Sequence, residues 1–135
     1  MKTTLSEQIA RYGILFILAP MVVFHILVLT GVVPYTIVWG GRLTSKAEMI
    51  QFELISIASL VLMLFVVLLH AGLVRISLRP LFFKIAFWVM AGLFLLNTIG
   101  NMESLNETER LIFTPVTFLL FLFSLRLVFS APVKR

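Results

Sequence analysis

Asn97–Arg110 is the part of this 135-residue chain best able to support binding or acid–base chemistry. The run, NTIGNMESLNETER, holds three of the six acidic residues, three asparagines and one arginine, and it separates two strongly apolar segments. Asn97 and Asn101 are four residues apart and share a face if the preceding helix continues. Amide and carboxylate side chains at the same depth of the membrane could bind a polar headgroup or transfer a proton. The sequence has no phosphate-binding loop, dinucleotide fingerprint or metalloprotease motif, so no spacing specifies a reaction.

Glu53 is a carboxylate within an apolar segment, where an unpaired charge is costly. It therefore needs a cation or hydrogen-bond donors. Arg42 and Arg110 are predicted on the same side of the membrane, and we expect one of them to be its partner. A structural clamp is the favoured use, and a proton or ligand site is the alternative.

His25 lies five residues after Pro20 in the first apolar segment, at membrane depth. The simpler interpretation is a hydrogen-bonded histidine facing another helix. The alternative is a proton relay or ligand contact, because ionisable groups inside membranes are functional candidates. His70 is expected near the membrane interface at the other end of the second segment. No metal site and no cofactor are predicted.

The composition indicates an integral membrane protein with one domain, residues 1–135. Hydrophobic residues make up 61% of the chain and charged residues 13%, against roughly 45–50% and 25% in soluble domains. Cysteine is absent, which excludes disulfides and thiol chemistry. The net charge of +5 comes from scattered basic residues with no patch typical of nucleic-acid binding.

Four continuously apolar runs are long enough to cross a bilayer, which takes about 20 residues. We expect an all-α, four-transmembrane-helix antiparallel bundle with helices at about 12–33, 46–74, 81–101 and 107–131. The first run is too long for a signal peptide and no cleavage site follows it, so it is interpreted as a retained helix. The short connection 75–80 predicts a hairpin of helices two and three.

Basic residues set the expected orientation. Eight of the eleven lysines and arginines lie in the N-terminal tail, the second connection and the C-terminal end. Both termini are therefore predicted to be cytoplasmic in the plasma membrane, taken to be a bacterial inner membrane. The first and third connections then share the outer side.

Local signals refine this plan. Ser45 and Glu48 match a capping box that starts helix two near Lys46. Gly40-Gly41 permits a turn with positive φ. In segment four, Pro115 predicts a kink. A stripe at helical spacing is expected to face neighbouring helices: Arg110, Thr114, Thr117, Phe121 and Ser124.

Three elements together carry a family resemblance: WGGRL, a glutamate near the start of helix two, and NTIGN followed by a glutamate and Thr-Pro. The pattern resembles small four-helix bacterial membrane proteins of uncharacterised function, and in general plan it is similar to DoxX-like proteins. The resemblance implies a four-helix membrane fold and no particular activity. Cysteine-dependent quinone reductases of this size are excluded because the chain has no cysteine.

Three functions remain open. The first is a non-enzymatic protein that binds a lipid-like or small ligand, or a protein partner, through an outer polar cap. The second is an oligomeric transporter or channel subunit, and the third is an intramembrane enzyme with a glutamate as acid or base. The predicted ligand-binding residues are Trp39, Arg42, Glu53, Asn97, Asn101, Glu103 and Arg110, with His25 as a possible intramembrane proton site.

Overall fold

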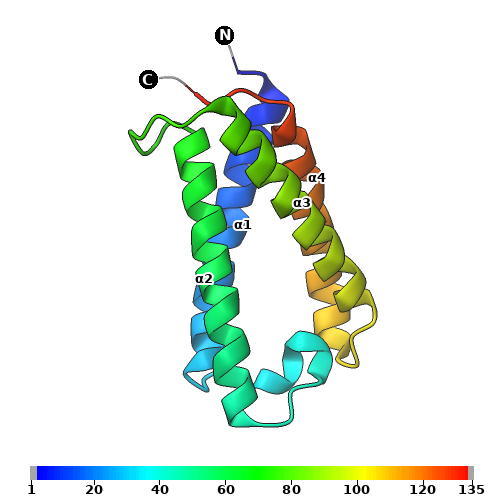
Figure 1. Cartoon of the computed structure of the whole chain (residues 1–135). Helices are drawn as coiled ribbons and strands as arrows, with labels where there is room; N and C mark the ends of the chain where they lie inside the picture. The colour runs from blue at the N-terminus through cyan, green and yellow to red at the C-terminus, as the bar shows by residue number, and fades with distance from the viewer. Residues whose placement is uncertain (1–2, 134–135) are drawn as a thin grey trace.

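A computed structural model describes residues 3–133, which contain helices and no strand. The four long helices follow one another along the chain, with short helical pieces in the α1–α2 and α3–α4 connections (Figure 1). Their bounds are α1 Leu5–Leu29, α2 Lys46–His70, α3 Pro80–Met102 and α4 Thr114–Val128, with the short turns η1 Tyr35–Ile37, η2 Trp39–Gly41 and η3 Glu109–Phe113. The all-helical prediction is confirmed.

Helix α1 begins and ends earlier than the hydropathy predicted. Thr4 and Glu7 form a full capping box, in which Thr4 Oγ1 accepts from Glu7 N and Glu7 Oε2 accepts from Thr4 N. These bonds start the helix at Leu5, seven residues before the predicted bound. Gly31, with φ of 81°, then ends it at Leu29 because a left-handed residue stops the helical hydrogen-bond series.

The start of α2 is as predicted, and its end is not. Ser45 Oγ accepts from Glu48 N at 3.2 Å, so the helix begins at Lys46. The Glu48 carboxylate bonds to Thr44 rather than back to Ser45. Gly72, with φ of 69°, terminates the helix after His70, four residues short of the predicted bound.

The fourth span contains an irregular turn before its proline. Residues Glu109–Phe113 form a π-helical turn that leads into α4, where Pro115 occupies the first turn. A proline cannot donate the regular backbone hydrogen bond and its ring crowds the carbonyl four residues before it, here Leu111. The π-turn lies directly before the proline, where the regular helical hydrogen-bond series is interrupted.

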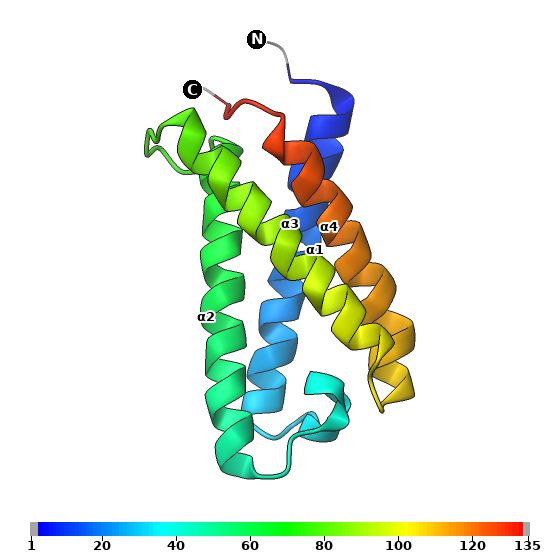
Figure 2. The same cartoon turned by 45° about the vertical axis from the view of Figure 1, so that its right-hand side comes forward.

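Helices α2 and α3 diverge over much of their length. Both views show them close together near the chain termini and apart at the opposite end, while α3 follows α4 (Figures 1 and 2). The main contacts of α1 are with α2 and α4. The predicted hairpin of helices two and three therefore packs only near its connection, residues 71–79, and α3 packs mainly against α4.

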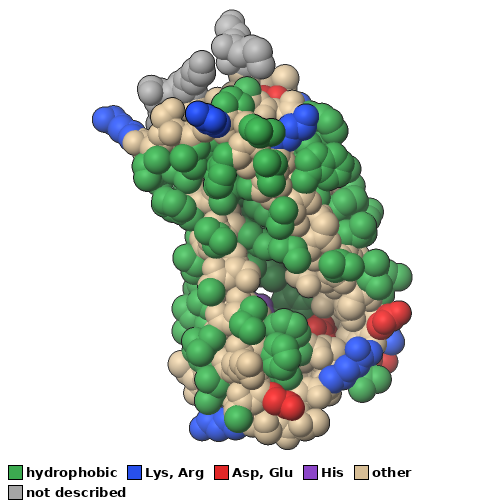
Figure 3. All heavy atoms as spheres, in the orientation of Figure 1, with side chains coloured by type: hydrophobic (Ala, Val, Ile, Leu, Met, Phe, Trp, Pro, Cys, Tyr) green, Lys and Arg blue, Asp and Glu red, His purple; other side chains and the backbone are tan. Residues whose placement is uncertain are grey.

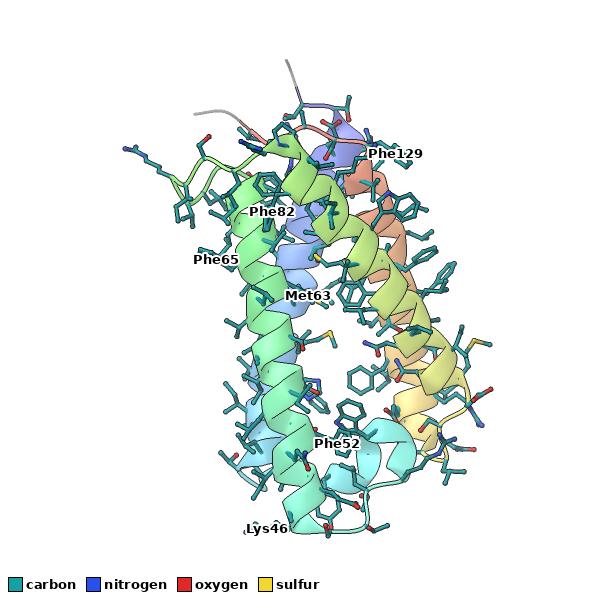
Figure 4. The ribbon with its side chains drawn as sticks, in the orientation of Figure 1. Lys46, Phe52, Met63, Phe65, Phe82 and Phe129 are labelled. Atoms are coloured by element: carbon teal, nitrogen blue, oxygen red, sulfur yellow. The ribbon has the colours of Figure 1, made fainter. Side chains whose placement is uncertain are left out.

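Two hydrophobic cores result from this arrangement. The larger one fills the half of the bundle that holds the termini, called here the terminal half, and includes Leu18, Val67, Phe87 and Leu120. A smaller one, around Val28, Val38 and Met49, lies under the α1–α2 connection at the other end, called the distal end. Figure 4 places Lys46 at the distal end and Phe129 at the terminal end. The space between the two cores holds the site described below.

All four spans are long and apolar enough to cross a membrane, which indicates a multi-pass membrane protein. Large apolar side chains cover the outside of the bundle (Figure 3). Phe16 is 83% exposed, and Leu111 is 70% exposed. Such an exterior suits hydrocarbon and would be a liability in water.

Polar contacts at the terminal end tie α1, α2 and the C-terminal segment together. Arg11 Nε donates to His70 Nδ1 at 3.1 Å, and Arg11 Nη2 donates to the Ala131 carbonyl at 2.9 Å. His70 Nε2 lies 3.2 Å from Ser130 Oγ, and Val133 N donates to the His70 carbonyl at 2.9 Å. His70 is fully buried beneath the chain end, and it is the last residue of α2, at the end of the span where it was predicted.

Candidate functional site

The two distal connections form one cap. Glu109 Oε2 accepts from Gly40 N at 2.8 Å and from Ser104 Oγ at 2.5 Å. Leu105 N donates to the Gly40 carbonyl at 3.1 Å. These bonds join the α1–α2 connection to the α3–α4 connection, as the predicted outer cap requires. Glu109 is 6% exposed, so its carboxylate is held inside the cap.

Backbone geometry explains why the cap sequence is Trp-Gly-Gly. Gly40 and Gly41 have φ of 70° and 67°, so the predicted positive-φ turn is confirmed. Trp39 also has positive φ, at 54°, which is uncommon for a residue with a side chain. A Cβ on Gly41 would lie 3.3 Å from the Thr36 carbonyl oxygen of the same connection and 3.7 Å from Asn106 N of the other, so glycine suits this tightly packed turn.

Glu53 joins α1, α2 and the cap. Its Oε2 lies 2.6 Å from His25 Nδ1, and its Oε1 accepts from Trp39 Nε1 at 3.2 Å. The carboxylate is fully buried, and 14% of the His25 side chain is exposed. The bond uses Nδ1, so His25 Nε2 is left available to other groups.

The predicted arginine partners of Glu53 are wrong. Arg42 Nη2 donates to the Glu103 backbone carbonyl at 3.3 Å, and Arg110 pairs with Glu107 on the surface at 3.5 Å. A histidine suits this position because its ring nitrogen reaches the Glu53 carboxylate directly from the facing helix α1. The structure thus agrees with the interpretation of His25 as a hydrogen-bonded residue facing another helix.

A cavity of about 450 Å³ lies between α2 and α3, beneath the cap. Figure 3 shows this hollow on the face between the two helices, with a histidine and an acidic side chain visible inside it. It exists because α2 and α3 diverge and present small side chains there, Ser56 and Ser59 from α2 and Gly100 from α3. Most of the wall is apolar, with Leu60, Met63, Leu93, Phe94 and Phe113 among its residues.

A hydroxyl network holds the wall formed by α3 and α4. Thr98 Oγ1 donates to Thr117 Oγ1 at 3.0 Å, and Asn101 Nδ2 donates to the same oxygen at 3.2 Å. Thr117 in turn donates to the Phe113 carbonyl at 2.8 Å. The stripe predicted in segment four is therefore partly confirmed, since Thr117 and Ser124 are buried and Arg110 is exposed.

Thr117→Val is expected to lower the free energy of unfolding by about 1 kcal/mol, since Asn101 Nδ2 loses its acceptor while Thr98 Oγ1 keeps the Phe94 carbonyl. Thermal unfolding of the purified protein in mild detergent measures this loss. Thr114→Val is the matched control, because the Thr114 hydroxyl is buried without a hydrogen-bond partner among residues 3–133 and its loss is expected to be neutral or stabilising. Equal destabilisation by both variants would contradict the role of the network.

The predicted site residues divide into three groups. Trp39, Arg42, Asn97, Asn101 and His25 all line the cavity, and Glu53 lies behind it as the partner of His25 and Trp39. The side chains of Glu103 and Arg110 are exposed outside the cavity, because the α3 end and the π-turn direct them outward. Ser56, Ser59 and Thr117 were not among the predicted binding residues, and Glu109 was singled out only as part of the polar run 97–110. Ser56 follows Glu53 at helical spacing, which was the available signal for it.

Residues 3–133 contain no group of three or more His, Asp or Glu side chains placed to hold a metal ion. The chain gives no match to any protein-family model, curated protein or solved structure. Its function must therefore be argued from the cavity itself.

Proposed function

We propose that this protein is a non-enzymatic membrane protein that binds a small amphipathic molecule in the distal cavity. The observation that carries the proposal is a largely apolar cavity containing polar groups that lack protein partners. Within residues 3–133, the side chains of Ser56, Ser59 and Asn97 make no hydrogen bond, and His25 bonds only through Nδ1. Polar groups in an apolar setting are costly without partners, and a ligand would supply them.

Charge indicates the character of the ligand's polar end. Both carboxylates near the cavity are occupied by protein donors, Glu53 by His25 and Trp39, and Glu109 by Gly40 and Ser104. Arg42 bonds to a backbone carbonyl and to no carboxylate of the described chain. The available groups are therefore neutral or positive, and they favour a neutral or anionic polar end over a cationic one.

The same proposal places the protein in the plasma membrane, and specifically a bacterial inner membrane, with both termini cytoplasmic. The concentration of lysine and arginine in the tails and in the 75–84 region supports this orientation. Both termini lie at one end of the bundle (Figure 1). The cap and cavity would then face the outer leaflet.

Gly100→Phe is expected to remove the bound molecule. Gly100 lines the cavity and a Cβ there meets nothing within 4 Å, so a phenyl ring enters the space a ligand would use. The protein is purified in mild detergent, and co-purifying amphiphiles are quantified by mass spectrometry. We expect at least a tenfold loss, which corresponds to about 1.4 kcal/mol of binding free energy.

Gly92→Phe is the matched control for this experiment. Gly92 lies on the same helix, has the same open surroundings and does not line the cavity. The control variant should retain the molecule at the wild-type level. Wild-type protein that carries no more amphiphile than Gly100→Phe would overturn the proposed function.

A further inference from the structure

A second void lies on the outside of the bundle between α1 and α4. It has a volume of about 290 Å³. Every residue lining it is apolar: Phe16, Ile17, Pro20, Met21, Phe24, Phe113 and Val116. We call this void the α1–α4 groove. Within a bilayer it would be in contact with hydrocarbon.

Three side chains separate the groove from the cavity. Met21, Phe24 and Phe113 line both spaces, so one side of each faces the groove and the other faces the cavity. The rings of Phe24 and Phe113 are in contact, with centroids 5.1 Å apart and planes inclined by 49°. The partition between the two voids is thus one layer of side chains, and Phe24 also contacts the His25 ring edge to face, with centroids 5.5 Å apart.

The backbone beside this partition is irregular on both helices. Pro20 interrupts the hydrogen-bond series of α1 next to Met21, and Phe113 ends the π-turn that precedes Pro115. Single π-turns are frequent at functional sites because they displace side chains from their regular helical positions. Here the π-turn sets the position of Phe113, one of the three partition residues.

We infer that the ligand is a membrane-resident molecule with a single long hydrocarbon chain and that this chain lies in the α1–α4 groove. The inference rests on the proposed function. The chain crosses the partition by displacing the contacting rings of Phe24 and Phe113, while the polar end remains at His25, Asn97 and Arg42. This arrangement keeps the chain in an apolar environment throughout and gives the polar end its hydrogen-bond partners.

The opposite side of the cavity is less suited to the chain. The mouth between α2 and α3 presents Ser56, Ser59, Asn97 and Asn101 among its apolar residues. A hydrocarbon chain lying across these groups would separate them from any partner, at a cost that the α1–α4 groove does not impose. The chemistry of the two openings therefore assigns the polar end to one and the chain to the other.

The test uses a long-chain fatty acid that carries a photoreactive diazirine at its methyl end. Full-length protein in phosphatidylcholine nanodiscs is irradiated with this probe, and the labelled residues are mapped by mass spectrometry with and without excess unmodified fatty acid. Label that the excess fatty acid suppresses is expected on Phe16, Ile17 and Val116. Such competition separates a specific site from general lipid contact.

A variant of the partition provides a second measurement. Phe113→Trp places a larger ring in the partition, which narrows the passage, and it is expected to reduce competed groove labelling at least fivefold. Phe118→Trp is the control, because Phe118 is exposed on the same membrane span and lines neither void.

Competed labelling confined to α2–α3 residues such as Ile55, Leu93 and Leu96 would overturn the inference and leave the proposed function standing. The inference would also be overturned if no residue of the protein showed labelling that excess fatty acid suppresses. The proposed function itself fails only on the separate comparison of wild-type protein with Gly100→Phe. The two failures are therefore distinguishable.

Discussion

Glu53→Leu is expected to destabilise the protein by about 3 kcal/mol or more, since each donor left without its buried acceptor costs about 1–3 kcal/mol. The leucine is close in size to the glutamate and tolerated by the apolar surroundings, so packing is largely preserved. What is lost is the acceptor for His25 Nδ1 and Trp39 Nε1. Thermal unfolding in mild detergent measures the change.

A double variant identifies the source of this loss. In His25→Leu/Glu53→Leu both members of the buried pair are apolar, and replacing a buried pair as a unit is often close to neutral. The double variant should therefore be more stable than Glu53→Leu alone. Equal or greater destabilisation would contradict the pairing.

Glu107→Leu is the matched control for Glu53→Leu. The Glu107 side chain is 81% exposed and its contact with Arg110 is 3.5 Å. An exposed pair of this kind contributes about 0–1 kcal/mol. A loss at Glu107 as large as that at Glu53 would show that the assay reports removal of charge rather than loss of the buried contact.

The helices could be predicted from sequence because each depends on residues close together in the chain. Continuous apolar runs marked all four spans, and the Ser45–Glu48 cap placed the start of α2 at Lys46. The errors at helix ends came from local signals that hydropathy does not contain. Thr4 and Glu7 extended α1 toward the N-terminus, and Gly72 shortened α2.

The site was harder to predict because its contacts cross between distant segments. The predicted topology puts both connections on one side of the membrane. It therefore placed four residues at one depth, and all four line the cavity: Trp39, Arg42, Asn97 and Asn101. The partner of Glu53 could not be derived in this way, since counting charges points to an arginine and says nothing of a histidine on the facing helix. The chain end that covers His70 is likewise distant in sequence, since His70 and Ser130 are 60 residues apart.

His70→Leu is expected to destabilise the terminal end by about 3 kcal/mol, because hydrogen bonds to charged groups contribute about 1.5–3 kcal/mol and a buried neighbouring bond is lost with it. Arg11 is 2% exposed and would keep only the Ala131 carbonyl as a hydrogen-bond partner in the described chain. Leaving a buried cation short of partners is the costly part of this change. Thermal unfolding gives the global loss.

Hydrogen exchange at residues 126–133 separates this mechanism from a simple packing defect. Since Arg11 Nε donates to Nδ1, the ring proton of His70 lies on Nε2 and donates to Ser130 Oγ, which donates in turn to the Leu127 carbonyl. The substitution breaks this series at its centre, so exchange should rise in the C-terminal segment more than in α3. The double variant Arg11→Met/His70→Leu should recover part of the stability, because it removes the cation together with its partner. Arg75→Leu is the control: Arg75 is an exposed cation at the same end, and its loss should change neither the unfolding temperature nor the exchange. A double variant less stable than His70→Leu would contradict the assignment of the loss to Arg11.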